Sequence, residues 1–155
     1  MYNHKTIKTI SILEILFSYI LDMTTKKYHR AITYGTFDLF HIGHLRLLER
    51  IANLADEVIV AVSSDEFNKL KGKYCTIPFE NRRDIVAALR MVTKVIREDN
   101  WEQKIKDVQK YQCDVFVMGS DWEGQFDFLK PYCDVVYLPR TAGISSTSIK
   151  QKIQT

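Results

Sequence analysis

Two histidines, His41 and His44, lie on either side of Gly43 in the stretch FDLFHIGHLR, residues 37–46. The stretch follows an apolar, strand-like run and precedes a segment with helical periodicity. A spacing of three can aim both imidazoles at one point near a helix N-terminus, where the free N–H groups and the helix dipole favour a phosphate. Both rings could instead simply cap the helix. Their place after the first predicted strand favours a role in phosphoryl-type transfer.

A second segment, RTAGISSTSIK at residues 140–150, combines a cation with a run of hydroxyl groups. Arg140 follows an apolar run and Gly143 permits a turn. The hydroxyl residues then stand at the start of the last predicted helix: Ser145, Ser146, Thr147 and Ser148. Hydroxyls and helix N-terminal N–H groups can cradle a phosphate. An ordinary N-cap is the alternative, although four hydroxyl residues exceed what capping requires.

Basic residues supply the remaining candidates. Lys69, Lys71 and Lys73 belong to a polar segment, 65–78, that we expect to be a loop able to close over a polyphosphate. A solvated surface run is the simpler interpretation of three lysines. Further basic residues fall on predicted helices: Arg82, Arg83, Arg90 and Lys104.

The elements that must position these residues alternate along the chain. Predicted strands cover residues 30–35, 57–64, 94–99, 114–121 and 134–139, predicted helices cover 44–56, 79–92, 100–112 and 145–154, and residues 126–132 form a short helix or turn. Strands that alternate with helices predict an α/β fold, a doubly wound, Rossmann-like five-stranded parallel sheet with helices on both faces. Ligands then bind beyond the carboxyl ends of the strands. That rule selects residues 35–44, 63–73, 119–121 and 140–148.

Composition limits the function classes. The 155 residues fit one ordinary domain, and 46% hydrophobic with 26% charged residues is typical of a globular protein. A net charge of +3 is too small to indicate nucleic-acid binding. The three cysteines form no CxxC pair, so neither a disulfide framework nor a zinc site is indicated and no metal-ligating residue is expected. A reducing, cytoplasmic setting is the simplest interpretation.

Residues 1–29 are interpreted as an N-terminal extension and residues 30–155 as the functional domain. The apolar run 9–23 contains Glu14 and Asp22 and is shorter than the ~20 apolar residues of a membrane span. It also lacks a signal-peptide cleavage site. An amphipathic helix that packs on the body, joins a dimer contact or lies on a membrane is open, as is a natural start at Met23. We expect no membrane association.

The stretches GTFDLFHIGH and RTAGISSTSI together resemble the cytidylyltransferase branch of the HxGH nucleotidyltransferases, from about Ala31 to Ile153. That superfamily includes the class I aminoacyl-tRNA synthetases, which explains the letters HIGH. Other segments are similar to the glycerol-3-phosphate cytidylyltransferases: DEFN, NWEQK, DVFVMGSDWEG, FDFLK and VVYLPRT. The resemblance implies that CTP and sn-glycerol 3-phosphate give CDP-glycerol and pyrophosphate, used for teichoic-acid-type polymers. It also implies a homodimer and Mg²⁺ carried with CTP.

The resemblance also assigns residue roles. The HxGH pair matches His41 and His44, and the catalytic set adds Lys71, Arg90 and Arg140. Nucleotide contacts extend to Thr36, Phe37, Lys73, Arg140, Thr141, Ala142, Gly143, Ile144, Ser145, Ser146 and Thr147. Substrate contacts fall on Lys71, Lys104 and Arg82. Ala142, Ser146 and the N-terminal extension depart from the family pattern.

The expected reaction is in-line attack of the acceptor phosphate on the α-phosphorus of CTP, without a covalent enzyme intermediate or a general base. Two alternatives stay open. One is a cytidylyltransferase or adenylyltransferase of the same superfamily with another phosphorylated acceptor. The other is a catalytically silent nucleotide-binding module.

Overall fold

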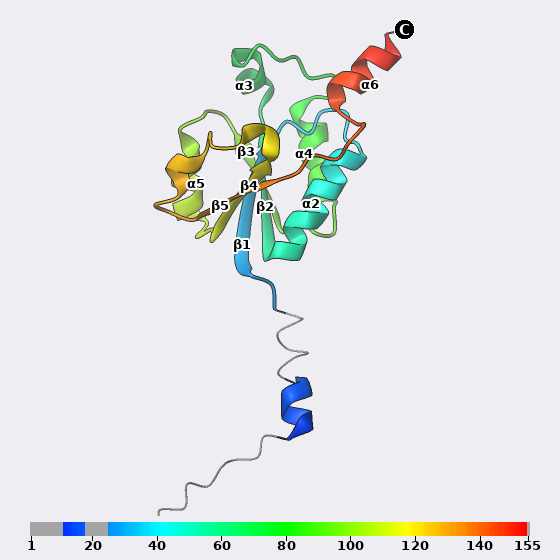
Figure 1. Ribbon diagram of the computed structural model, residues 1–155. Helices are drawn as coiled ribbons and strands as arrows, with labels where there is room; N and C mark the ends of the chain where they lie inside the picture. The colour runs from blue at the N-terminus through cyan, green and yellow to red at the C-terminus, as the bar shows by residue number, and fades with distance from the viewer. Residues whose placement is uncertain (1–10, 18–24, 155) are drawn as a thin grey trace, which may run out of the picture.

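Figure 1 shows the computed structural model, which describes residues 11–17 and 25–154. Five parallel strands form one sheet in the order β3-β2-β1-β4-β5. The strands are β1 (Tyr28–Gly35), β2 (Ala55–Ser63), β3 (Lys94–Glu98), β4 (Val115–Gly119) and β5 (Asp134–Leu138). The α-helices after β1 are α2 (Ile42–Leu54), α3 (Asp65–Leu70), α4 (Phe79–Ala87), α5 (Gln103–Lys110) and α6 (Ser146–Ile153). Short 3₁₀ turns are η1 (Ser120–Trp122) and η2 (Asp127–Leu129). The predicted doubly wound, Rossmann-like architecture is confirmed.

Side chains of the central strands alternate between two cores, as the period of two requires. In β2, Val58, Val60 and Val62 pack on the face covered by α2 and α4. Ile59 and Ala61 point to the opposite face, which is covered by α5 and η2. The two helical layers are visible on either side of the sheet in Figure 1. Burial on both faces explains why the strands read as continuous apolar runs.

The strand order reverses between β1 and β4, which lie side by side in the sheet. The neighbour of β1 on its other side is β2, and that of β4 is β5. From β1 the chain runs outward to β2 and β3, and then returns to the other side of β1 as β4. The carboxyl ends of β1 and β4 therefore border the switch-point crevice in which such sheets bind ligands. Gly35 and Gly119 are the last residues of these strands.

Segment 65–78 corrects the sequence prediction, because its first residues form helix α3 rather than loop. The hydroxyl of Ser64 accepts a hydrogen bond from the backbone N–H of Phe67, and Asp65 and Glu66 occupy the first turn. These are a helix N-cap and a favourable charge arrangement. The irregular part is thereby reduced to residues 71–78, which include Lys71 and Lys73.

Other boundaries differ less. Helix α2 begins at Ile42, two residues before the prediction, because His41 caps it. Helices α4 and α5 are shorter than predicted, and η1 occupies residues that were assigned to the fourth strand.

In the N-terminal extension, residues 12–17 are helical and capped by Ser11, whose hydroxyl accepts from the N–H of Glu14. Apolar side chains on this helix are exposed, among them Ile12, Leu16 and Phe17. Residues 9, 10 and 18–23 of the apolar run, which include the start site proposed at Met23, lie outside the described residues. Among residues 11–17 and 25–154, no helix has the length and apolar character to span a bilayer.

Candidate active site

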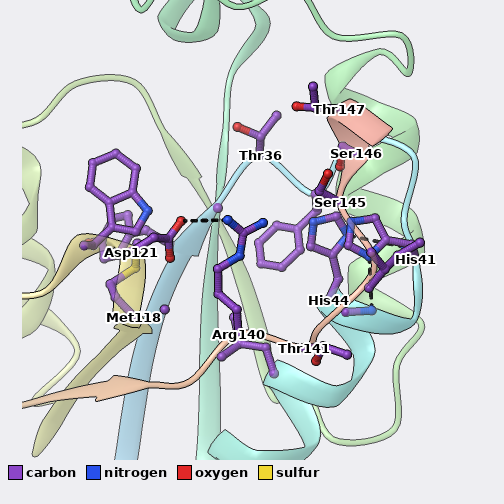
Figure 2. A pocket seen from close by; sticks show the side chains of 18 of the residues that line it. Thr36, His41, His44, Met118, Asp121, Arg140, Thr141, Ser145, Ser146 and Thr147 are labelled. Carbon is purple, nitrogen blue, oxygen red and sulfur yellow. Dashed lines mark hydrogen bonds and ion pairs between the residues drawn. The ribbon is translucent and has the colours of Figure 1, made fainter. Parts of the chain in front are cut away.

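His41 and His44 stack on each other at the N-terminus of α2, with ring centroids 3.8 Å apart. They form a capping box: Nδ1 of His41 accepts from the backbone N–H of Gly43, and Nδ1 of His44 accepts from the backbone N–H of His41. A Cβ on Gly43 would lie 2.8 Å from Cε1 of His41, so the glycine between them is needed for the rings to sit there. Both rings line the pocket beside β1 (Figure 2).

The caps decide which ring nitrogens carry protons. A neutral imidazole that accepts at Nδ1 carries its hydrogen on Nε2. His41 and His44 therefore each offer an Nε2–H donor at the pocket, while Nδ1 satisfies the helix. The structural interpretation, helix capping, is confirmed at Nδ1, and Nε2 of each ring stays available for the functional interpretation.

Burial keeps both imidazoles neutral. Burial lowers the pKa of His44 to about 4, and the neighbouring His41 contributes in the same direction. Burial also lowers the pKa of His41, with a further contribution from Arg140. At pH 7 the pair therefore supplies two neutral hydrogen-bond donors, placed where the α2 dipole and N–H groups attract an anion.

We predict that His44 in the free protein stays neutral down to about pH 5, because protonation requires a charge in a buried site. Imidazole ¹³C and ¹⁵N chemical shifts during a pH titration measure this. The unfolded chain binds this proton below the ordinary histidine pKa of ~6.5, so folding stability is greatest above that pH and falls as the pH is lowered toward 4. A His44 midpoint near 6.5 would contradict the prediction.

The turn before the histidines is held in an unusual conformation. Phe37 and Leu39 have positive φ angles of 54° and 48°, which cost L-residues energy. Asp38 between them is buried, and its carboxylate accepts from the N–H groups of Thr76 and Ile77 and pairs with Lys150 at 2.7 Å. Burial alone would raise the pKa of Asp38, but these partners outweigh it and hold the pKa below its usual range. Asp38 therefore joins the turn before His41 to segment 71–78 and to α6.

The second predicted segment lines the same pocket, with Ser145 and Ser146 beside the histidines (Figure 2). Ser145 caps α6 by accepting from the N–H of Ser148, and the hydroxyl of Ser148 accepts from the N–H of Ser145. The hydroxyl of Ser146 donates to the carbonyl of Asp38 at 2.8 Å. Three of the four hydroxyls are thus used within the protein. What this segment offers a phosphate is mainly Arg140, the Thr147 side chain and the N-terminus of α6.

The two segments enclose a cavity of about 360 Å³ at the carboxyl ends of β1 and β4. It contains most of the predicted nucleotide contacts: Thr36, Phe37, His41, His44, Lys73, Arg140, Thr141, Ile144, Ser145, Ser146 and Thr147. Ala142 and Gly143 instead border a separate hollow that residues 140–145 and 148 line. Arg140 reaches toward the cavity and lies 3.8 Å from Asp121.

A smaller cavity of about 150 Å³ adjoins the first and shares Tyr34, Gly35 and Thr36 with it. The predicted substrate lysines Lys71 and Lys104 both line it, and Lys73 lines both cavities. Lys104 is 1% exposed and its ammonium group lies 4.7 Å from the Trp101 ring centroid. The structure therefore brings together a nucleotide-sized cavity and a compact cationic cavity beside it.

Two predicted residues lie elsewhere. Arg82 is 1% exposed, and protein acceptors surround its guanidinium: the carbonyls of Thr36, Ser63 and Ile77 and the carboxylate of Asp65. These contacts give Arg82 a positioning role and correct the prediction of direct substrate contact. Arg90 is exposed in the turn between α4 and β3, which is the amino-terminal edge of the sheet. Within one chain that edge is opposite the cavities, so the predicted catalytic role of Arg90 is not supported by its position.

Sequence reasoning missed Glu98 as part of the site, and it gave no role to Ser63 and Asp38, which lie within the selected ranges 63–73 and 35–44. Glu98 and Ser63 are the last residues of β3 and β2 and lie side by side in the sheet register. A polar residue that ends an apolar strand was the available signal, because that position lies at the ligand edge of the sheet. The long-range partners of Asp38 left no such signal.

The described residues contain no group of three or more His, Cys, Asp or Glu side chains that could hold a metal ion. Asp121 is the carboxylate in the lining of the larger cavity. This donor set fits a cation that is held mainly by phosphate oxygens and water, with one protein carboxylate nearby, which is a common arrangement for Mg²⁺.

Comparisons with known proteins agree with this arrangement. Residues 32–152 match the family model described as cytidylyltransferase-like. The glycerol-3-phosphate cytidylyltransferase of Bacillus spizizenii is 57% identical over 79% of this chain and 95% of its own length. The enzyme of the same name from Staphylococcus aureus is 53% identical over 80% of this chain and 94% of its own length. A crystal structure of a lipopolysaccharide core biosynthesis protein from Thermoplasma volcanium shares the fold, with a TM-score of 0.63, 21% identity, and coverage of 74% of this chain and 98% of that one.

Proposed function

The chain belongs to the cytidylyltransferase-like family, and we propose that it condenses CTP with sn-glycerol 3-phosphate to form CDP-glycerol and pyrophosphate. The observation that carries the proposal is the pairing of two cavities at one sheet edge. One presents the neutral His41–His44 pair opposite Arg140, and the other presents Lys71 and Lys104. The first suits a nucleoside triphosphate and the second a small phosphate monoester.

In the proposed reaction, an oxygen of the acceptor phosphate forms a bond to the α-phosphorus while the bond to the pyrophosphate oxygen breaks. Lys71 and Lys104 hold the acceptor phosphate, and the shared wall of Gly35 and Thr36 lets it reach the nucleotide cavity. The Nε2–H groups of His41 and His44 donate to α-phosphate oxygens as charge increases. Arg140 and Lys73 neutralise the leaving pyrophosphate. Catalysis of this kind depends on positioning and electrostatic stabilisation, and no side chain needs to act as a base.

Mg²⁺ is proposed to enter with the triphosphate and to neutralise part of its charge, with Asp121 as the nearby carboxylate. By resemblance to the family, we further propose a homodimer, a cytoplasmic location and a role in teichoic-acid-type polymer synthesis. Sedimentation of the purified protein tests the dimer directly.

We expect purified protein with Mg²⁺ to convert CTP and glycerol 3-phosphate to CDP-glycerol, with kcat/KM for CTP at least about a hundredfold above that for ATP. Pyrophosphate release and product mass are measured over a panel of nucleotides and phosphorylated alcohols, with choline phosphate and ethanolamine phosphate as alternative acceptors.

Turnover of ATP without CTP would indicate an adenylyltransferase and contradict the proposal. Faster turnover of another phosphorylated alcohol would retain the cytidylyl transfer and replace the acceptor. CTP that binds but is consumed with no acceptor would indicate a silent binding module.

A further inference from the structure

Glu98 is a buried carboxylate placed between the two lysines of the smaller cavity, and no role has yet been given to it. The residue is 3% exposed and ends β3. Its Oε1 pairs with the Lys104 ammonium at 2.7 Å, and its Oε2 lies 3.8 Å from the Lys71 ammonium. One carboxylate thus contacts both candidate acceptor-binding cations.

Ser63 completes the connection between Glu98 and Lys71. Its hydroxyl donates to Oε2 of Glu98 and accepts from the Lys71 ammonium at 3.1 Å. Ser63 and Glu98 are register partners at the ends of β2 and β3, and the carbonyl of Glu98 also accepts from the N–H of Ser64 at 2.8 Å. The carboxylate is therefore fixed by two strand ends rather than by a loop, which is the more rigid way to hold a site.

Aromatic rings surround the ammonium groups of the two lysines but carry no charge that would neutralise them. The Lys104 ammonium lies 4.6 Å from the Tyr34 ring centroid and 4.7 Å from that of Trp101. The Lys71 ammonium lies 4.1 Å from the Phe67 centroid and 5.5 Å from that of Trp101. Ring faces favour cations only modestly, so two buried ammonium groups around one ring still need a counter-charge. Glu98 supplies that charge.

We propose that Glu98 is a positioning residue that holds the Lys71 and Lys104 ammonium groups at the smaller cavity and leaves them a combined charge of about +1 for an acceptor phosphate. This proposal rests on the proposed function for the identity of the acceptor. Without the carboxylate, repulsion and burial would favour a neutral or displaced lysine. Burial already lowers the pKa of Lys71, and Glu98 acts against that change, while Lys73 and Lys104 add to it.

The test compares Glu98→Gln with Glu98→Asp and with a matched control, Glu57→Gln. Glu57 also pairs with a basic residue on the sheet, Arg30, but near the start of β2 at the opposite edge. We expect Glu98→Gln to lower kcat/KM for glycerol 3-phosphate about 30-fold while KM for CTP changes less than about threefold. Glu98→Asp should recover most of the loss because it keeps the charge. Glu57→Gln should leave both parameters within about twofold.

Unchanged kcat/KM for the acceptor in folded Glu98→Gln would overturn the proposal, as would an equal loss for CTP and acceptor that Glu98→Asp does not restore. If Glu98→Gln does not fold, Ser63→Ala removes the connecting hydroxyl and should lower kcat/KM for the acceptor about threefold to fivefold with KM for CTP unchanged. An unaltered kcat/KM for the acceptor in Ser63→Ala would also overturn the proposal.

The wild-type assay separates this proposal from the proposed function. If the protein uses another phosphorylated alcohol, the same comparison is made with that acceptor. If no acceptor is turned over, the proposed function fails, and inorganic phosphate is titrated while lysine side-chain NMR signals are followed. Phosphate-dependent shifts of Lys71 and Lys104 that disappear in Glu98→Gln would support the positioning role, and shifts that persist would overturn it.

Discussion

Replacing His44 by alanine is expected to lower kcat about a hundredfold or more while the protein stays folded. The change removes the Nε2–H donor from the nucleotide cavity, where it would stabilise charge on the α-phosphate in the transition state. It also removes the acceptor that caps the N–H of His41, and a lost helix cap costs about 1 kcal/mol of folding stability. Steady-state kinetics and urea unfolding measure the two effects separately.

Two further substitutions divide the roles of the imidazole ring. Asparagine can place its oxygen near the position of Nδ1, so His44→Asn should retain the cap and the stability but not the rate. Glutamine can place its amide nitrogen near the position of Nε2, so His44→Gln should recover part of the rate. His29→Ala, at an exposed histidine near the start of β1, is the control and should stay within about twofold of wild type. Near-normal turnover in His44→Ala would remove this residue from the mechanism.

The sheet and the ligand edge could be predicted from sequence because they depend on local patterns. Apolar runs such as 57–64 predicted doubly buried strands, and the order of strands and helices predicted the switch-point crevice. His41 and Arg140 each follow the end of a strand, so their meeting at that crevice followed from topology. Helix α3 was missed because its six residues, DEFNKL, are mostly polar and too few to show an apolar stripe. Ser64 followed by Asp65 and Glu66 is nevertheless an N-terminal signal.

The parts that could not be predicted depend on partners far apart in the chain. Asp38 contacts residues 76, 77, 146 and 150, and only the folded structure brings them together. Apart from its place at the end of a strand, Glu98 has the sequence context of a surface acid next to Arg97, yet it is buried between two lysines. The same limit applies to Arg82 and Arg83, which are neighbours in sequence, although one is buried and the other lies at the surface.

Arg82→Ala is expected to lower the free energy of unfolding by about 3–5 kcal/mol, because the change removes a fully buried guanidinium that four acceptors share. The guanidinium is fully enclosed and donates to three backbone carbonyls and to Asp65. Without it, the carbonyls of Thr36, Ser63 and Ile77 lose the hydrogen-bond donor that they share. Arg82→Lys should recover only part of the stability, because one ammonium group cannot reach four acceptors in a fixed planar arrangement.

Arg83→Ala on the same helix is the matched control. Arg83 is half-exposed and pairs with the adjacent Asp84, so its loss should leave the urea concentration at which the protein unfolds close to that of the wild type. Urea unfolding followed by circular dichroism measures the stability of all three variants. Kinetics at low temperature measure the activity of the molecules that remain folded. If Arg82 instead contacted the acceptor directly, Arg82→Ala would unfold at the wild-type urea concentration and show a raised KM for glycerol 3-phosphate. The positioning role predicts the opposite pattern, in which Arg82→Ala unfolds at a lower urea concentration than the wild type. Because the carbonyl of Thr36 is one of the partners of Arg82, the activity of the molecules that remain folded also falls, through displacement of the turn that leads to His41.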